Sequence, residues 1–247
     1  MKTMKIVRWV SKRGILFVFL LSIVFATNAS AYTFTASDPD LGLAASADFT
    51  VSGSSLIVTL TNTSTTDVII PREVLTALFF DVEGVDALTP VSAVLGAGSV
   101  VWFGSNGGGN VGGEWAYKSD ITAPHGATEG ISSAGYGIFG GANFNGTDLN
   151  PPSALDGLNY GITSAGDDAS TGNAEVTGNV PLIKNQVLFT LGIPSGQTVT
   201  GITNVSFQYG TALTDPNVNV PIPAAAWLLG SGLLGLVAVR RRFTKKW

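Results

Sequence analysis

Residues 48–61 read DFTVSGSSLIVTLT, and this stretch decides the class of fold. Two runs of apolar and β-branched residues flank Gly53 and Ser54, and a two-residue connection that begins with glycine is typical of a tight β-hairpin. In the second run, apolar side chains recur at every second position from Leu56 to Leu60, which is the period of a strand with one face in a core. The stretch therefore predicts an antiparallel hairpin.

Similar signals recur along the chain, separated by turns rich in Gly, Pro, Asn and Ser. No amphipathic helical pattern of ten residues or more interrupts them. Many short strands with such turns favour an all-β fold, namely a β-sandwich, and both a jelly roll and an immunoglobulin-like Greek key remain open. Further strands are expected at residues 68–70, 74–82, 88–95, 99–103, 180–191 and 199–209.

Residues 96–146 have a different composition, with 15 glycines among 51 residues and aromatic side chains scattered between them. Disordered segments are poor in aromatic residues. We therefore expect long loops that are fixed in place by aromatic anchors.

The N-terminus has the pattern of an export signal. Five Lys and Arg residues precede residue 14, and an apolar run over residues 14–26 follows, too short to span a bilayer comfortably. Ala29 and Ala31 supply the small residues that signal peptidase requires. Residues 1–31 are predicted to be a signal peptide that is cut after Ala31, so that the protein is exported.

The C-terminus is predicted to be a membrane anchor. Residues 222–239 are 18 residues without a charge, and a helix of that length spans about 27 Å, close to the thickness of a hydrocarbon core. Arg240, Arg241 and Arg242 follow directly, and such a basic cluster stays in the cytoplasm. The body would thus lie outside the membrane, joined to the helix by a short polar stalk over residues 215–220.

Between these ends, residues 32–219 form one predicted ectodomain, followed by a C-terminal signal over residues 220–247. The body holds all 17 acidic residues but only three basic ones, which gives it a formal net charge of −14. Such a charge repels nucleic acid and anionic lipid. The chain has no cysteine, which excludes thiol catalysis, zinc–cysteine sites and iron–sulfur clusters.

The C-terminus resembles the PEP-CTERM signal, which exosortases process in Gram-negative bacteria. That signal has a short proline-containing motif, a glycine-rich hydrophobic helix and an arginine cluster, in this order. Here Ile222 replaces the glutamate of the most typical motif, Pro-Glu-Pro. The matching motif residues are Val220, Pro221, Ile222 and Pro223.

The body is similar to an uncharacterised family of exosortase-dependent surface proteins, in residues 112–117 (GGEWAY), 157–167 (GLNYGITSAGD) and 181–185 (PLIKN). The two resemblances imply processing by an exosortase, an inner-membrane stage through the C-terminal helix, and then display on the cell surface or in the extracellular matrix. They also imply an association with exopolysaccharide and biofilm, and they imply no activity.

Catalytic chemistry is not predicted. His125 is the single histidine, and it lies in a turn sequence, Ala-Pro-His-Gly-Ala, while no Gly-x-Ser-x-Gly elbow frames any serine. We therefore expect a non-enzymatic surface protein. A carbohydrate-binding or adhesive module is the alternative, and a polysaccharide-active enzyme is the third interpretation.

Two groups of acidic residues lie in predicted turns, and no other cofactor is indicated. Carboxylates close together in loops suit Ca²⁺, although solvated turn residues give the same pattern, so both interpretations stay open. The residues are Asp81, Glu83 and Asp86 in one group, and Asp167 and Asp168 in the other.

Aromatic residues in the glycine-rich region allow two interpretations as well. Their rings could form a platform on which sugar rings stack, or they could anchor loops in the core. These residues are Trp102, Trp115, Tyr117 and Tyr136.

Overall fold

The computed structural model describes residues 30–135, 147–148, 155 and 157–221. Most of the predicted signal peptide, including Ala29, lies outside these residues, as do Tyr136 and everything from Ile222 onward, which includes Pro223, the predicted membrane helix and the arginine cluster. In the described part of the chain, no helix has the length and apolar character needed to span a membrane.

The described residues form strands and four short 3-10 helices, which confirms the all-β prediction. The strands are β1 (Ala31–Asp38), β2 (Leu43–Ser52), β3 (Ser55–Asn62), β4 (Leu75–Glu83), β5 (Thr89–Leu95), β6 (Val100–Trp102), β7 (Ala116–Lys118), β8 (Glu129–Ser132), β9 (Thr147–Asp148), β10 (Ile162–Thr163), β11 (Leu182–Lys184), β12 (Gln186–Gly192), β13 (Gly201–Tyr209) and β14 (Asn217–Asn219). The helices are η1 (Pro71–Glu73), η2 (Gly107–Gly109), η3 (Gly112–Glu114) and η4 (Pro124–Gly126).

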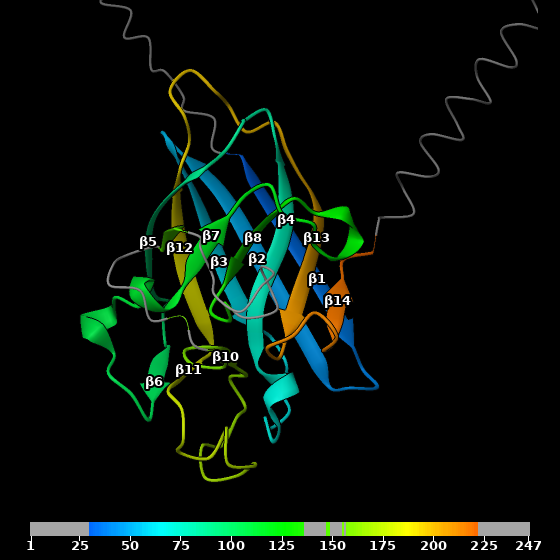
Figure 1. The fold of residues 1–247 in the computed structure, drawn as a ribbon, viewed down its shortest axis with the longest axis vertical. Coiled ribbons are helices and arrows are strands. Elements are labelled where there is room, and N and C mark those ends of the chain that lie inside the picture. Colours follow the sequence, from blue (N-terminus) through cyan, green and yellow to red (C-terminus); the bar gives the residue numbers. More distant parts are fainter. Residues whose placement is uncertain (1–29, 136–146, 149–154, 156, 222–247) are drawn as a thin grey trace, which may run out of the picture.

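The first sheet has five strands in the order β1-β2-β3-β12-β5, all antiparallel (Figure 1). The hairpin expected at residues 48–61 forms its centre: β2 and β3 pair from Ser52↔Ser55 to Ala45↔Asn62. Gly53 adopts a φ of 60° in the connection, a left-handed conformation that glycine reaches without steric cost. The hairpin prediction is confirmed.

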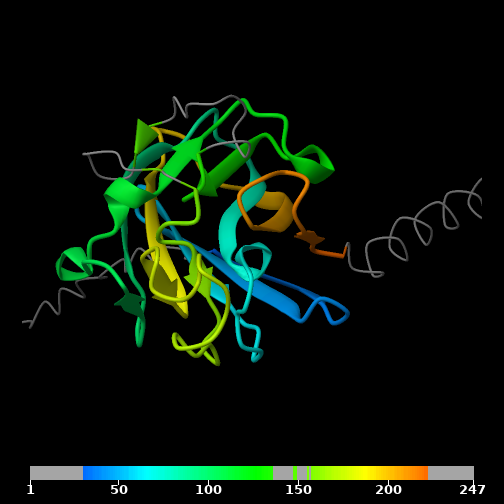
Figure 2. The same ribbon diagram turned by 60° about the horizontal axis from the view of Figure 1, so that its bottom comes forward.

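The second sheet is built around β4, which pairs with β13 and β8, and with β10 at one end. Its main path runs β6-β11-β10-β4-β8-β7-β9, and β14 extends it beyond β13. Only β10 and β11 pair in parallel among the described strands. In Figure 2, β7 and β8 (green) lie on the opposite side of the molecule from β1 and β2 (blue).

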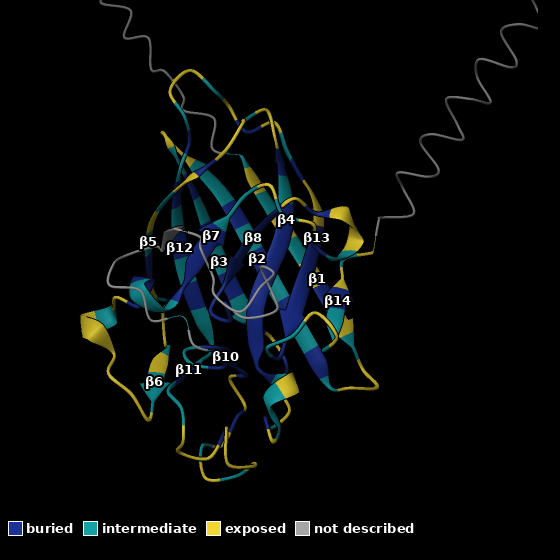
Figure 3. Cartoon of the chain, viewed as in Figure 1, coloured by how far each residue is buried: buried dark blue, intermediate teal, exposed yellow. Residues whose placement is uncertain are grey.

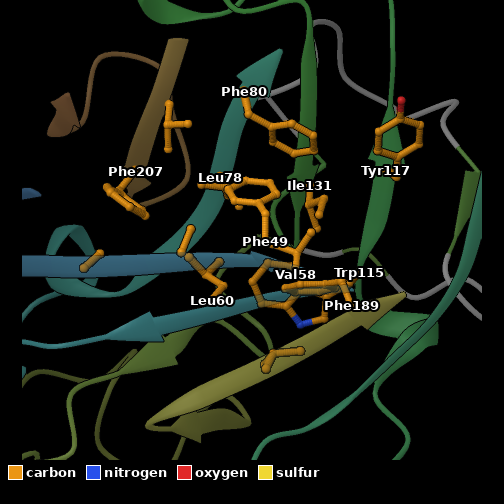
Figure 4. Packing of buried hydrophobic residues seen from close by; sticks show 14 of the residues in the cluster. Phe49, Val58, Leu60, Leu78, Phe80, Trp115, Tyr117, Ile131, Phe189 and Phe207 are labelled. Carbon is orange, nitrogen blue, oxygen red and sulfur yellow. The ribbon is translucent and has the colours of Figure 1, made fainter. Parts of the chain in front are cut away.

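One large hydrophobic cluster takes side chains from both sheets. Phe49 of β2 contacts Phe80 of β4 edge to face, with ring centroids 5.2 Å apart (Figure 4). Trp115, just before β7, makes a similar contact with Phe189 of β12 at 5.0 Å. Figure 3 shows buried residues (dark blue) along β4 and β13 of the second sheet. The two sheets therefore pack around a shared core.

Residues 68–70 were expected to be a strand and are not. Their backbone N–H groups are taken by side chains: Val68 donates to Asp167 Oδ1 at 3.0 Å, and Ile69 and Ile70 donate to Glu73 Oε2 at 2.9 and 3.3 Å. Because these carboxylates accept the hydrogen bonds of the backbone N–H groups, the segment needs no partner strand.

Residues 180–191 were expected to be one strand, and the structure divides them between the two sheets. Asn185 has a φ of 90°, which ends β11 and redirects the chain into β12. β11 pairs with β6 and β10 in the second sheet, whereas β12 pairs with β3 and β5 in the first. A strand pattern with continuous hydrophobic character does not reveal such a change of sheet.

The predicted loop region 96–146 contains three short strands, β6 to β8, in its described parts. The predicted polar stalk over residues 215–220 is wrong, because Asn217–Asn219 forms β14 and Val218 is buried in the main core. β1 begins at Ala31, one residue before the predicted mature N-terminus.

Candidate functional site

The last described residues of the chain are bound to the body. β14 pairs with β13 from Gln208↔Asn217 to Ser206↔Asn219. Val220 continues the ladder, because its N–H donates to the carbonyl of Val205 at 3.1 Å. Pro221 follows at once and is exposed. The first residue of the predicted sorting motif, Val220, thus continues the sheet.

Gln208 holds this hairpin together from inside, and its side chain is fully buried. Its Nε2 group lies within hydrogen-bond distance of the carbonyls of Tyr209, Ala212 and Asp215, at 2.9, 3.0 and 3.1 Å. Its Oε1 accepts a hydrogen bond from Asn217 Nδ2 at 3.1 Å. The amide therefore fixes the loop that leads into β14.

Asp215 stabilises the same loop from its outer side. Its Oδ2 accepts hydrogen bonds from the N–H groups of Thr211 and Ala212, both at 3.0 Å. Sequence reasoning missed Gln208 and Asp215 as positioning residues. Asp-Pro at residues 215–216 is a turn signal, but nothing in the sequence indicates that a glutamine on β13 is fully buried.

A groove of about 480 Å³ lies beside this exit point. Most of its wall comes from β13 and from the last described residues, with β1 and η4 on the other sides. The groove is mainly apolar, with a few amide and hydroxyl groups at its rim. Its lining residues are Phe34, His125, Ile202, Thr203, Asn204, Val205, Asn219, Val220 and Pro221.

Of the two acidic groups, the one at Asp167 and Asp168 joins two loops. Asp67, which sequence reasoning did not single out, accepts hydrogen bonds from the N–H of Asp168 at 2.9 Å and from the hydroxyl of Thr171 at 2.5 Å. The hydrogen bond from Thr171 contributes most to holding the pKa of Asp67 below its ordinary value. Burial raises the pKa of Asp167, and the neighbouring Asp67 adds to this effect.

The other acidic group is spread over three different contacts. Asp81 accepts hydrogen bonds from Thr128 and Asn204, Asp86 accepts one from Gln197 Nε2 at 2.6 Å, and the Glu83 carboxylate lies over Gly201. Within the described ranges, no three acidic or histidine side chains come together as a metal site would require. The carboxylates of Asp81 and Asp86 instead accept hydrogen bonds from nearby loops and strands.

Of the two interpretations of the aromatic residues, anchoring in the core holds for Trp115 and Tyr117. Trp115 is fully buried and Tyr117 is 4% exposed, so neither ring is available to a sugar; both are core residues, the other interpretation that the sequence allowed. Both side chains belong to the main hydrophobic cluster, at and just before β7, which pairs with β8 and β9. Trp102 is half-buried, and the Lys184 ammonium lies 5.0 Å from its ring centroid.

Phe103, which sequence reasoning also passed over, is the more exposed aromatic side chain. It is 46% exposed and has a φ of 58°, which is unusual for a bulky residue. Tyr160 has a similar φ of 56°, and its hydroxyl donates to the carbonyl of Ser105 at 3.0 Å. Together with Trp102, these rings lie around the loop that follows β6.

His125 lies in η4, is exposed and has a φ of 60°. Among the described residues, no serine hydroxyl forms a hydrogen bond with His125. Ser132 and Ser133 are buried, and their hydroxyls bond to the carbonyl of Thr76. A serine–histidine nucleophile is therefore not assembled here.

Comparisons with known proteins show no family: no family model matches the chain, and no curated protein or solved structure matches it significantly. Its function must therefore be inferred from its own residues.

Proposed function

We propose that this chain is a non-enzymatic surface protein that an exosortase sorts. The observation that carries the proposal is the order of three parts at the C-terminus: the motif at residues 220–223, the uncharged run over residues 222–239, and the cluster Arg240, Arg241 and Arg242. The structure adds support, because the last strand of the body ends at Asn219 and the motif starts at the next residue.

The same proposal places the mature body outside the inner membrane, first anchored by residues 222–239 and then on the cell surface or in the matrix of a Gram-negative bacterium. Signal peptidase would cut after Ala31. That cut removes the hydrogen bond from Val51 N–H to the carbonyl of Ser30 and the first pair of edge strand β1, Ala31↔Thr50. The pairs from Tyr32↔Phe49 to Asp38↔Leu43 remain. Partners in this account are signal peptidase, the exosortase and exopolysaccharide.

The finer form of the fold belongs to this proposal as well. We propose that residues 32–219 form a single β-sandwich ectodomain, either a jelly roll or an immunoglobulin-like fold. Support comes from the shared hydrophobic cluster and from the mainly antiparallel pairing in both sheets.

The proposal is tested by expressing the chain, with an epitope tag after Trp247, in cells with and without an exosortase. The tag should disappear from the surface-exposed population only when the enzyme is present. A matched control replaces residues 220–223 with Ala-Ser-Ala-Ser and leaves the helix and tail intact. Retention of the tag at the surface in exosortase-positive cells would rule the function out.

A carbohydrate-binding or adhesive role is the second candidate, and one observation favours it: Phe103 exposes 46% of its surface next to Trp102. Aromatic faces suit the apolar C–H faces of sugar rings. A glycan array should then show binding that Phe103→Ala abolishes and Phe34→Ala does not. A screen for turnover of matrix polysaccharides tests the third interpretation, a polysaccharide-active enzyme.

A further inference from the structure

The sorting motif does not follow a free linker. The N–H of Val220 donates a hydrogen bond of 3.1 Å to the carbonyl of Val205, and the three residues before Val220 form β14. Val218, in the middle of β14, is 8% exposed and belongs to the main core. Release of residues 217–220 therefore requires β14 to leave β13 and expose an apolar side chain.

A protease needs the residues before the cut bond to be free for its own main-chain hydrogen bonds. It binds several residues on the N-terminal side of the bond that it cuts as an extended segment, through main-chain hydrogen bonds like those of an added strand. In this protein the main chain of residues 217–220 already pairs with β13 on one edge. Cleavage of such a segment proceeds from a locally opened state, at a rate that follows the population of that state.

We propose that β14 is a latch that controls processing: the bonds from Asn217 to Pro221, where the motif begins, become accessible to the sorting protease only while β14 and Val220 are detached from β13. The identity of the protease rests on the proposed function, but the latch does not. Gln208 and Asp215 hold the latch closed, because they fix the loop from which β14 emerges.

The register of the hairpin allows a reversible disulfide between β13 and β14. Since Val220 N–H bonds to the carbonyl of Val205, and Tyr209 N–H bonds to that of Pro216, Ser206 and Asn219 form a non-hydrogen-bonded pair, whose side chains lie close together. Ser206 Oγ is buried without a hydrogen-bond partner, so its replacement removes no such bond. The chain has no cysteine of its own. Ser206→Cys with Asn219→Cys should therefore form one disulfide that pins β14.

The test uses the full exported chain, purified in detergent from cells that lack the sorting protease. Proteinase K, which cuts with little sequence preference, is added to the oxidised and to the reduced double variant, and mass spectrometry follows cuts within residues 217–221. Cleavage of the oxidised form should be slower by about tenfold or more than that of the reduced form. Equal rates would overturn the latch, because they would mean that the protease takes the paired segment as it is.

A second variant tests the latch in the opening direction. Asp215→Ala removes two accepted N–H bonds from the loop before β14 and should speed cleavage roughly fivefold. Asn106→Ala is the matched control, since Asn106 Oδ1 accepts the N–H of Gly108 in an exposed loop that does not lead into β14. An unchanged rate in Asp215→Ala, or an equal increase in both variants, would contradict the proposal.

Processing by the exosortase in cells separates the two claims. If the wild-type chain is processed and the oxidised double variant is not, both the function and the latch are supported. If an exosortase never processes the wild type, the proposed function fails, and the proteinase K comparison still decides whether the latch exists.

Discussion

The hydroxyl of Tyr117 donates a hydrogen bond of 2.8 Å to Oε2 of Glu129, and both side chains are buried where β7 pairs with β8. Burial raises the pKa of Glu129 to about 7; the Tyr117 bond opposes this rise, and the negative charges of Asp81 and Asp120 add to it. Burial and the charge of Glu129 also raise the pKa of Tyr117, so that its hydroxyl stays protonated and remains a donor.

The stability of the body should therefore fall as the pH rises through neutrality. The folded protein binds the Glu129 proton more tightly than the unfolded chain does. This contribution to the free energy of unfolding is fully present below about pH 4.5 and is lost as the pH rises through about 7. The loss should be on the order of 3 kcal/mol.

Glu129→Gln isolates this effect, because the amide keeps an oxygen for the Tyr117 hydroxyl but does not ionise. Urea unfolding of both proteins between pH 5 and pH 8 gives the difference in unfolding free energy at each pH. The wild type should lose stability relative to the variant as the pH rises. A pH-independent difference would show that Glu129 ionises at its ordinary pKa.

Trp115 should be a core residue in energetic terms as well. It is fully buried against Phe189, and Trp115→Ala should lower the free energy of unfolding by about 3–5 kcal/mol. Trp115→Phe should cost much less, because the indole N–H has no hydrogen-bond partner to lose. Trp102→Ala, which loses a contact with Lys184, should cost about 1 kcal/mol. Denaturant unfolding would refute this placement if Trp102→Ala were the costlier change.

Calcium should stabilise the body no more than sodium chloride of equal ionic strength. The carboxylates of Asp81, Asp86 and Asp167 already accept hydrogen bonds from neighbouring groups, and no three ligands converge in the described part of the chain. Both salts should raise the melting temperature by screening the acidic charges. Differential scanning calorimetry compares them directly. A further rise of several degrees with calcium would reveal a bound ion.

The arginine cluster should determine topology. Replacement of Arg240, Arg241 and Arg242 by Asn leaves only two basic residues after the apolar run, Lys245 and Lys246, which weakens the signal that keeps the tail in the cytoplasm. Accessibility of a C-terminal cysteine tag to a membrane-impermeant reagent should rise in this variant. If labelling and membrane retention stay as in the wild type, the two lysines are sufficient.

The fold was predictable where side-chain period and turn chemistry agree. The hairpin of β2 and β3 has both signals, and β4, β5 and β13 lie within two residues of their predicted ranges. β14 was not predictable, because only Val218 among its three residues is apolar, and its place depends on the buried side chain of Gln208 in β13. β8 was missed for a similar reason, since it begins with the charged residue Glu129, which is buried between β4 and the hydroxyl of Tyr117.

The candidate sites, like the strands, were predictable only where the signal lies in neighbouring residues. Short-range patterns predict a motif that begins at Val220, which stays a prediction, and they could not tell buried rings such as Trp115 from half-exposed ones such as Trp102. Asp67 escaped notice because it meets Asp168 only through contact between loops about a hundred residues apart. Such contacts depend on topology, which single-sequence patterns do not encode.

The intact mass of the surface form tests the central claim most directly. The chain is expressed in cells with and without an exosortase, recovered from the cell surface, and measured by mass spectrometry. The account predicts an N-terminus at Tyr32 in both cases and, only when the enzyme is present, a C-terminus within or next to residues 220–223. Surface protein that still ends at Trp247 in exosortase-positive cells would contradict the account.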